Sequence, residues 1–576
     1  PIPEFLDGDF SRLLTTEQIG RDALGRAVYA GQIFDTQTLR QVDGEWVADP
    51  FAGNIIPQNR RSAVSGKIID IYRKNYQPMI PGALTDNSAG PQSESPWFHQ
   101  TQLTLKADHA FSPGMKLTGS LILTERPRIL ADQGGIWDPS AAEGSGGPLA
   151  RARKQKVSSR ALRLSNNWNI LPNLIHTVSF AYNRYRNPSL SAQSEGNWNK
   201  YLGLENSTSA GLFPEISFGT PVNGIGTTAI GYGSSGHSVA DNYIFADAMD
   251  YMRGRHKIKF GGEFWKQQMN SHTGLDVLSI DFSPMQTSIP GHSWSNRTGF
   301  GFASFFMGEA AGGRKNVPFD LYGRRKYVAF FFQDDYQILD SLTLNLGLRW
   351  EQSRPLSEKY GRWANFNPDL MNTLLNVKGA LEFLPNPGAS FEKQKDWKEF
   401  APRIGAAYRF GNRIVLRAGY GVDYIPLGIN YWSGIPYGFA PGFRGTNSRT
   451  PSQNLPKFNW DNGYPDNYIA PVKDSNLLVY GMVSVDERSL YTGYTHQYNA
   501  SLQLELDKDT VFEAAFLGNL GRRLHNGALR RNQPSRAAYE DPNVNPFAWV
   551  WDSDSAAAAG VNYPYQGFSN YAGVAL

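Results

Sequence analysis

The chain of 576 residues contains no cysteine, which excludes disulfides, cysteine metal ligands and thiol chemistry. Long apolar runs are also missing. The most apolar stretch, Phe300 to Met307, is far shorter than the ~20 residues of a transmembrane helix. No excess of one charge is present either, because 56 basic and 52 acidic residues are interspersed and leave a net charge of +4. These absences exclude a helical membrane protein and predict no nucleic-acid partner.

Recognisable catalytic and metal-binding patterns are also absent, so we predict no enzyme activity, no cofactor and no catalytic, cofactor-binding or metal-binding residues. The nine histidines are scattered, and no nucleophile lies in a known motif. Gly231, Gly233 and Gly236 match G-x-G-x-x-G but lack the flanking strand and helix of a dinucleotide site. Five loop acids lack the spacing of an EF-hand and are predicted to be solvated: Asp461, Asp466, Asp541, Asp552 and Asp554.

Aromatic residues and glycine are abundant, with 28 Tyr, 33 Phe, 14 Trp and 58 Gly. Aromatic girdles at the two lipid–water interfaces of a membrane barrel use such residues, although soluble propellers and sandwiches use them too. One segment shows strict alternation, with apolar side chains at Leu342, Leu344, Leu346, Leu348 and Trp350 and mostly polar residues between them. This pattern predicts a strand with one apolar and one polar face.

The alternation recurs in six pairs of segments joined by short connections. The pairs are 101–107 with 115–124, 157–168 with 174–186, 243–252 with 257–266, 325–338 with 342–354, 404–410 with 414–424, and 498–506 with 512–516. Turn signals such as Pro113-Gly114 and Gly411-Asn412 stand between paired segments. We therefore predict about twelve strands in six hairpins, each near the ~10 residues of a tilted membrane-spanning strand.

Long stretches separate the hairpins, at about 127–156, 187–240, 269–323, 355–399, 425–494 and 521–576. Loops beyond ~12–15 residues are uncommon in compact soluble domains. Outer-membrane barrels combine short periplasmic turns with long extracellular loops. The sequence thus predicts an all-β protein, a transmembrane antiparallel up-and-down β-barrel with long extracellular loops and short periplasmic turns, in contact with outer-membrane lipid.

Two aspartates conflict with the alternation, because Asp247 and Asp334 share a face with apolar residues. A charge facing lipid costs ~2–4 kcal/mol at the bilayer midplane but only ~0–1 near an interface. Asp334 lies close to a short turn, so we expect it at the periplasmic rim.

Charged residues on the opposite, inward face have two interpretations. The cations could favour anionic solutes in a lumen; they are Arg403, Arg409, Arg413, Arg417, Lys257 and Lys259. We favour the other interpretation, a polar interior balanced by acids such as Glu263, Glu351 and Asp423. The role of the loop aromatics also has two interpretations, because they could contact a ligand or pack loops together. These are Tyr431, Trp432, Tyr437, Phe439, Phe443, Trp460 and Tyr464.

The segments from Tyr327 to Tyr336 and from Leu342 to Glu351 closely resemble TonB-dependent outer-membrane receptors, and most closely their Oar-like branch, which is abundant in Acidobacteria and carries a carboxypeptidase-regulatory-like domain. Further stretches fit the same branch in the same order: Asp9 to Ser11, Gly25 to Tyr29, Gly31 to Asp35, Pro50 to Pro57, Phe302 to Gly308 and Glu513 to Asn519. Together they span nearly the whole chain.

The resemblance implies a 22-stranded barrel around a plug domain, coupled through a TonB box to the TonB–ExbB–ExbD motor. This sequence supplies about twelve of those strands and no signal peptide, plug or TonB box, so we interpret it as an internal piece of a longer receptor. We expect residues 1–98 to form an early barrel segment and extracellular loop, 99–520 the barrel strands with their loops, and 521–576 an extracellular loop beyond which the barrel continues. The function predicted is uptake of an unknown extracellular ligand captured by the loops; a passive porin-like or structural barrel is the alternative.

Overall fold

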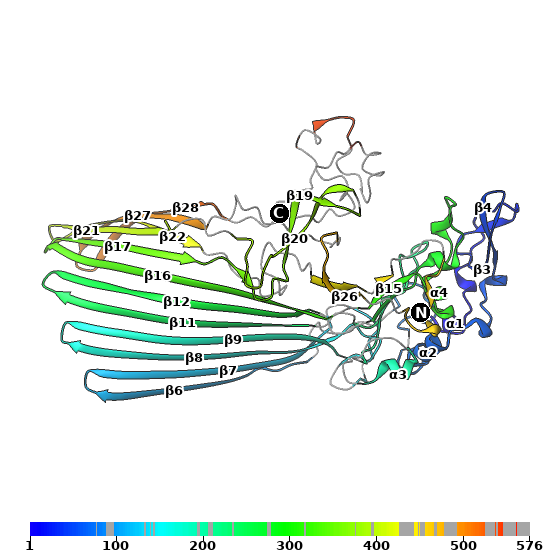
Figure 1. Cartoon of the computed structure of the whole chain (residues 1–576), viewed down its shortest axis with the longest axis horizontal. Helices are drawn as coiled ribbons and strands as arrows, with labels where there is room; N and C mark the ends of the chain where they lie inside the picture. The colour runs from blue at the N-terminus through cyan, green and yellow to red at the C-terminus, as the bar shows by residue number, and fades with distance from the viewer. Residues whose placement is uncertain are drawn as a thin grey trace.

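Twelve long strands in six antiparallel hairpins dominate the computed structural model of the chain (Figure 1). They are β6 (Thr101–Ser112), β7 (Met115–Leu130), β8 (Arg153–Leu171), β9 (Leu174–Ser191), β11 (Gly236–Arg253), β12 (His256–Thr273), β16 (Phe319–Leu339), β17 (Leu342–Ser353), β21 (Phe400–Phe410), β22 (Ile414–Ile425), β27 (Gly493–Asp507) and β28 (Thr510–Arg522). Each strand between β6 and β28 pairs with the strand before it and the strand after it, whereas β6 pairs only with β7 and β28 only with β27. The predicted strand number and up-and-down topology are confirmed.

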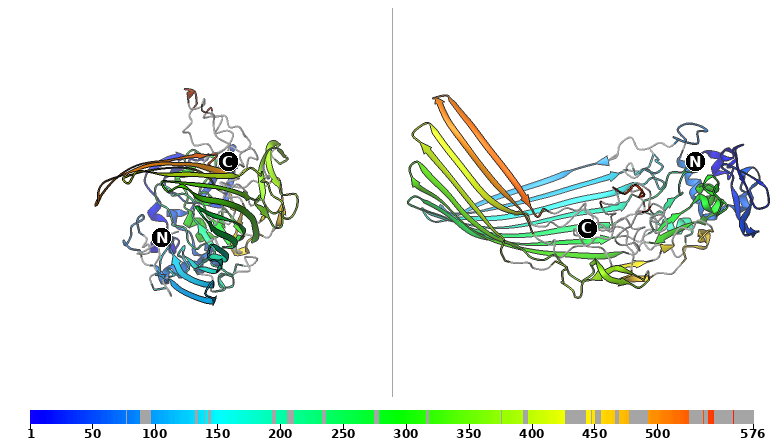
Figure 2. Two further views of the ribbon diagram at one scale, coloured as in Figure 1. Left: turned by 90° about the vertical axis from the view of Figure 1, so that its left-hand side faces the viewer. Right: turned by 90° about the horizontal axis from the view of Figure 1, so that it is seen from above.

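The structure describes all residues except 77, 88–96, 132–133, 139, 142–144, 193–195, 205–210, 233–235, 274–277, 316–317, 375, 393–396, 426–442, 447, 450–454, 466–468, 477–491, 525–535, 537–539, 545–559 and 561–576. Among the described residues the sheet is an open, curved wall with β28 at one edge and β6 at the other (Figure 2). Two short strands extend it, β5 (Trp97–Phe98) on β7 and β18 (Ser357–Glu358) on β16.

The strands are longer than the ~10 residues predicted, from 11 in β21 to 21 in β16. The apolar alternation stops where side chains leave the lipid, but the backbone ladder continues past that point because the neighbouring strand still supplies hydrogen-bond partners. On β16, for example, pairing with β12 runs on to Phe319, nine residues beyond Val328. Hydrophobic alternation measures the apolar band and underestimates the strand.

The two faces of the wall follow from the pairing register. Phe245 lies opposite Phe264, Phe264 opposite Val328, and Phe330 opposite Trp350. These residues share the outward face, where large apolar side chains are exposed: Leu103, Leu105, Leu164, Phe180, Phe260, Phe332, Leu346, Leu348, Ile404, Leu416, Leu502 and Phe516. Small and polar residues alternate with them on the inward face. This is the lipid-facing and lumen-facing arrangement of a membrane barrel.

Glycines close two of the short turns at the end of the wall where the hairpins reverse. Arg253 pairs with His256, so only two residues turn the chain there, and Gly254 has φ of +60°. Gly411 has φ of +58° in the turn after Phe410. Positive φ carries little cost for glycine and a steric cost for residues with a Cβ, which is why these positions predict turns correctly.

The described parts of the long connections, together with residues 1–76 and 78–87, lie toward the opposite end of the wall (Figure 1). We call the part built around one buried core, which includes residues 1–76, 212–230, 278–311 and 458–464, the head. The helices of this end are α1 (Pro3–Leu6), η1 (Ser11–Leu13), η2 (Ala52–Asn54), η3 (Gln58–Arg60), α2 (Ala63–Asn75), α3 (Trp198–Leu202), η5 (Pro284–Thr287), η6 (Ser295–Arg297), α4 (Gly301–Met307) and η7 (Trp460–Asn462). No helix in the described part of the chain is long and apolar enough to cross a membrane.

In the described part of the chain, six small sheets accompany these helices. Their strands are β1 (Gln18–Arg21) with β2 (Ala27–Tyr29); β3 (Phe34–Val42) with β4 (Glu45–Pro50); β10 (Glu215–Ser217), β13 (Leu278–Asp281), β15 (Gly312–Lys315) and β24 (Ser448–Arg449); β14 (Glu309–Ala310) with β25 (Phe458–Asn459); β19 (Ala364–Asn372) with β20 (Val377–Phe383); and β23 (Phe443–Thr446) with β26 (Ile469–Lys473). Several pair segments from different long connections. The head end is therefore tied together by backbone hydrogen bonds across large sequence separations.

Helix α4 lies at the centre of the head and every one of its residues is buried. It contains no charged residue, and Phe302, Phe305 and Phe306 are fully enclosed. Gly301 begins it at a point where a Cβ would meet the carbonyl oxygen of Phe218 at 1.9 Å, so only glycine permits this backbone approach. Gly308, with φ of +75°, ends it. The most apolar stretch of the sequence is thus a core helix.

Candidate functional site on the inward face and the head

A network of charged and aromatic side chains occupies the inward face where β12, β16 and β17 adjoin. The Arg349 guanidinium pairs with the carboxylates of Glu263 and Glu351, and donates a hydrogen bond to the Tyr327 hydroxyl at 2.8 Å. Tyr327 in turn donates to Glu351 at 2.7 Å, and Trp265 Nε1 donates to Glu263 at 3.0 Å. Two carboxylates against one guanidinium, supported by neutral donors, form a rigid polar patch on the lumen wall.

A glycine-floored groove of about 500 Å³ lies further along the same face, toward β27. Gly347, Gly405, Gly419 and Gly421 face inward on β17, β21 and β22, and the register places Gly405 opposite Gly419. Its polar lining comprises Gln333, Asn345, Arg403, Asp423, Gln497 and Asn499. The volume falls within the ~300–1,000 Å³ of small-molecule sites, and the lining offers neutral hydrogen-bonding groups and one ion pair.

The predicted inward cations are spread over the wall and are largely matched by acceptors. Arg403 pairs with Asp423 in the groove, Lys259 lies 3.6 Å from Asp250, and Arg417 donates to Gln503. Arg409 donates to the Asp340 carbonyl at 3.4 Å. Glu263 and Glu351 lie on the inward face as predicted, but their partner is Arg349, a residue outside the predicted set. Arg413 and Lys257 lie near the short turns. The cations do not form one anion-binding cluster.

Both aspartates of the outward face have histidine partners. Asp334 Oδ2 is 2.7 Å from His256 Nδ1, and His256 lies beside a short turn, as expected for a rim position. Asp247 Oδ2 is 3.0 Å from His176 Nε2 on the neighbouring strand. The sequence reveals the conflicting acids but not their partners, because the histidines belong to other hairpins or strands.

The head carries a half-open pocket of about 500 Å³ between α2 and α3. Asp70, Lys74 and Asn75 of α2 form one side, and Trp198 and Tyr201 of α3 form the other. The two rings meet edge to face with centroids 5.7 Å apart, and the buried Trp198 indole N–H has no hydrogen-bond partner among the described residues. Aromatic surface with flanking charges suits recognition of a small polar ligand.

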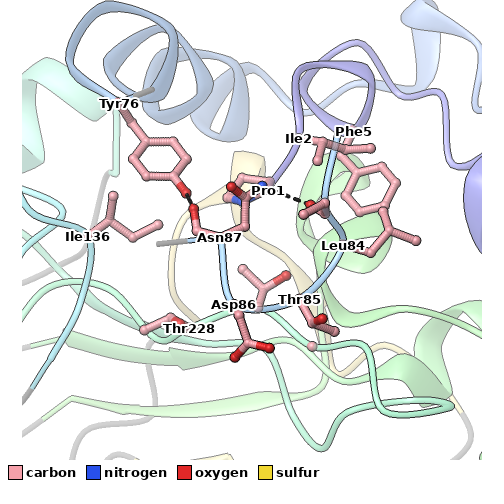
Figure 3. Close-up of a pocket in the computed structure, with 13 residues that line it drawn as sticks. Pro1, Ile2, Phe5, Tyr76, Leu84, Thr85, Asp86, Asn87, Ile136 and Thr228 are labelled. Atoms are coloured by element: carbon pink, nitrogen blue, oxygen red, sulfur yellow. Dashed lines mark hydrogen bonds between the residues drawn. The ribbon is translucent and has the colours of Figure 1, made fainter. Parts of the chain in front are cut away.

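A second head pocket lies where the start of the chain meets the loop after α2 (Figure 3). Its lining includes Ile2, Phe5, Leu84 and Thr228, and the Tyr76 hydroxyl donates to the Asn87 carbonyl at 2.5 Å. At about 90 Å³ it is well below the volume of drug-sized ligand sites. We interpret it as a packing space that fixes residues 83–87 on the head.

Two of the loop aromatics, Trp460 and Tyr464, pack loops together. Trp460 is fully buried against Phe282 and Phe305, and its indole donates to Ser62 Oγ at 2.8 Å. The side chains of Tyr431, Trp432, Tyr437, Phe439 and Phe443 lie outside the described residues.

Asp461 has a defined structural role that the sequence did not reveal. Its carboxylate accepts hydrogen bonds from Ser62 Oγ at 2.6 Å and from the backbone N–H groups of Ala63 and Val64 at 3.0 Å each. It therefore caps α2 from a segment almost 400 residues away, while the residue itself stays exposed to solvent as predicted. Asp541 accepts from Asn543 within its own turn. Asp466, Asp552 and Asp554 lie outside the described residues.

Two of the three glycines in the G-x-G-x-x-G match lie among the described residues, and neither begins a helix. Gly231 lies in a loop and Gly236 begins β11, a strand rather than a phosphate-binding helix; Gly233 is not among the described residues. In the described part of the chain no three acidic, histidine or cysteine side chains group as they would to hold a metal ion.

A protein-family model described as an outer membrane beta barrel domain matches residues 1–575. No curated protein matches the chain. Among solved structures, the chain is similar to the ferric-catecholate import receptor Fiu of Escherichia coli K12 (11% identity, TM-score 0.37, 73% of this chain and 51% of that chain). It is also similar to the siderophore receptor PiuA of Acinetobacter baumannii (10%, 0.35, 75% and 51%) and the FrpB iron transporter of Neisseria meningitidis, F3-3 variant (9%, 0.37, 78% and 50%). The chain spans about half the length of these structures.

Proposed function

The chain belongs to the outer membrane beta-barrel family and lies in the outer membrane of a Gram-negative cell, and from this premise we propose that it is the barrel portion of a TonB-dependent transporter that takes up a ligand captured at its extracellular end. The supporting observation is the head. Long connections from separate hairpins share one buried core there and carry a ligand-sized aromatic pocket. A passive pore requires no such folded assembly over its mouth.

The proposed path begins at the pocket between α2 and α3 and continues along the inward face. Trp198 and Tyr201 would make the first contacts, and the glycine-floored groove would offer a second polar surface deeper in the wall. Transfer of the ligand from the head pocket to the glycine-floored groove requires energy from outside the barrel. We propose that it comes from the TonB–ExbB–ExbD motor, acting through a plug and a TonB box encoded upstream of this sequence. No covalent chemistry takes part.

Conductance distinguishes this proposal from the passive porin-like barrel. The complete protein, reconstituted in planar bilayers without the motor, is expected to remain closed, and the purified periplasmic domain of TonB is expected to bind it. A steady, ungated conductance together with no TonB binding would favour the passive barrel.

A matched pair of variants tests the head pocket. Trp198→Ala removes a ring that lines the head pocket, whereas Trp168→Ala removes an exposed ring from the lipid-facing side of β8. In cells that depend on this protein for a nutrient, we expect Trp198→Ala to lower uptake at limiting nutrient concentration and Trp168→Ala to leave it unchanged. Equal uptake by both variants would place ligand capture elsewhere.

A further inference from the structure

The outward face of the wall changes character abruptly on the side nearer the head. The last apolar register row, followed from β8 to β16, contains Leu164, Phe180, Phe245, Phe264 and Val328. The next row toward the head contains Leu162, Tyr182, Tyr243, Lys266 and Lys326. The row after it contains Arg160, Arg184, Asp241, Gln268 and Arg324. Arg186 follows one step further along β9.

We call Arg160, Arg184, Arg186, Lys266, Arg324 and Lys326 the cation band. They stand on the same face as the lipid-facing phenylalanines, directly beyond the apolar rows and level with Tyr182 and Tyr243. Aromatic residues in this position form the girdle at a membrane interface. The cation band therefore lies at the headgroup level of the leaflet on the head side.

The cation band carries uncompensated positive charge. Arg160, Arg186, Lys266 and Lys326 are exposed, and the described residues give none of them an acidic partner. The one acid within the rows, Asp241, is buried and already accepts from Arg184 at 3.1 Å and from Tyr182 at 2.8 Å. Neighbouring acids on this face are also occupied: Glu125 lies 3.1 Å from Lys156, and Asp320 pairs with His272 at 2.6 Å.

The opposite rim of the same face shows that this imbalance is specific to the head side. There Asp334 lies 2.7 Å from His256, and Arg255 pairs with Asp340 at 2.9 Å. The same strands thus present a balanced rim near the short turns and a cationic rim near the head. Such a wall fits an asymmetric membrane in which the leaflet on the head side carries anionic groups.

We propose that the cation band is a binding site for the phosphate groups of a phosphorylated lipid headgroup in the leaflet on the head side. The acyl chains of such a lipid would lie on the phenylalanine rows while its phosphates reach Lys266, Lys326 and the arginines. Guanidinium and ammonium groups are the side chains that bind phosphate, and Tyr182 and Tyr243 would contact the sugar or glycerol part at the same depth. The site requires that the head is extracellular, as the proposed function assumes, but not that the barrel transports anything.

Binding of lipopolysaccharide to the protein purified in a neutral detergent tests this site. The variant Lys266→Gln with Lys326→Gln removes two exposed charges, and the matched control Arg163→Gln with Lys257→Gln removes two exposed charges from the inward face. At low ionic strength a basic residue near an anionic surface contributes about 1 kcal/mol, so we expect the band variant to weaken binding about 25-fold and the control to bind as the parent does.

Two further probes define the source of the phosphate. Lipopolysaccharide with its lipid phosphates removed is expected to bind the parent protein as weakly as the untreated lipid binds the band variant. Inorganic phosphate is expected not to compete at equal concentration, because it lacks the acyl chains. Competition by inorganic phosphate would assign the band to a soluble anion and overturn the lipid assignment. Equal weakening by the inward control, or unchanged binding by the band variant, would overturn the site itself.

The outcomes also separate this site from the proposed function. A protein that conducts passively yet loses lipid binding in the band variant would retain the site and reject the transporter. Migration on unheated gels, which reports the folded barrel, must be the same for all variants, so that a change in binding reports the removed charges.

Discussion

The wall and the head remove their large apolar side chains from water in opposite ways. In the wall, large apolar residues such as Phe330 and Phe332 remain 57% and 52% exposed in the isolated chain, because their solvent is lipid. In the head, Phe302 and Phe305 are completely enclosed by other parts of the same chain. The wall therefore depends on the membrane and on local alternation, and the head depends on contacts between segments far apart in sequence. Substitutions should affect the two regions independently.

The largest effect is expected from the centre of the head. Phe305→Ala removes a ring that contacts Phe282, Phe302 and Trp460, and truncation of a buried phenylalanine costs about 3–5 kcal/mol. We expect the head to become sensitive to protease while the wall keeps its heat-modifiable migration on gels. Phe332→Ala, on the lipid face, should leave the head resistant. If Phe305→Ala also abolished the folded wall, the two regions would not be independent.

A charge placed on the lipid-facing side should destabilise the wall instead of the head. Phe330→Arg puts a cation in the middle of the apolar rows, at a cost of about 2–4 kcal/mol near the bilayer midplane. Gln333→Arg adds the same charge to the inward face of the same strand, where polar side chains already stand. Urea titration of the protein folded into vesicles should show a lower midpoint for Phe330→Arg alone. Equal midpoints would contradict the assignment of one lipid-facing and one inward face, and a lower midpoint for Gln333→Arg alone would reverse it.

The same contrast explains how much the sequence could predict. Alternation is local, so residues such as Leu346 and Leu348 identify their strand, its face and its hairpin without knowledge of the rest of the fold. The head pockets and the cap on α2 could not be found in this way, because Asp461 meets Ser62 only after the chain has folded. The glycine-floored groove was partly predictable from the sequence. Gly347, Gly405, Gly419 and Gly421 all occupy inward positions of predicted strands, and that shared parity was a signal present in the sequence.

A smaller effect is expected from the contact that ties Asp461 to α2. Asp461→Ala removes a carboxylate that caps two backbone N–H groups, and loss of a helix cap costs about 1–2 kcal/mol. The amides of Ala63 and Val64 should exchange with deuterium faster, whereas the strands of the wall should exchange as before. Asp541→Ala, which removes an acceptor confined to its own turn, serves as the control. Unchanged exchange at Ala63 and Val64 would contradict the capping role.

The smallest effect concerns a buried acid of the head and depends on pH. Burial raises the pKa of Glu309 above its ordinary value of 4.5, although the hydrogen bond from Thr36 and the charge of Arg60, 3.8 Å away, oppose the shift. An acid with a raised pKa binds its proton more tightly in the folded state. Its contribution to stability is therefore complete below pH 4.5 and is lost as the pH rises through the folded-state value.

Glu309→Gln should remove this dependence, because the amide can still accept the Thr36 hydrogen bond but carries no charge to be desolvated. Protease resistance of the parent head should fall modestly between pH 4.5 and pH 8, and that of the variant should stay level. Glu17→Gln, at an exposed acid paired with Arg297, is the control and should keep the parent's profile from pH 4.5 to pH 8. A variant head less resistant than the parent at pH 8 would show instead that the ion pair with Arg60 outweighs the cost of burying the charge. In that case the head, unlike the wall, would use a buried charge to hold its long connections together.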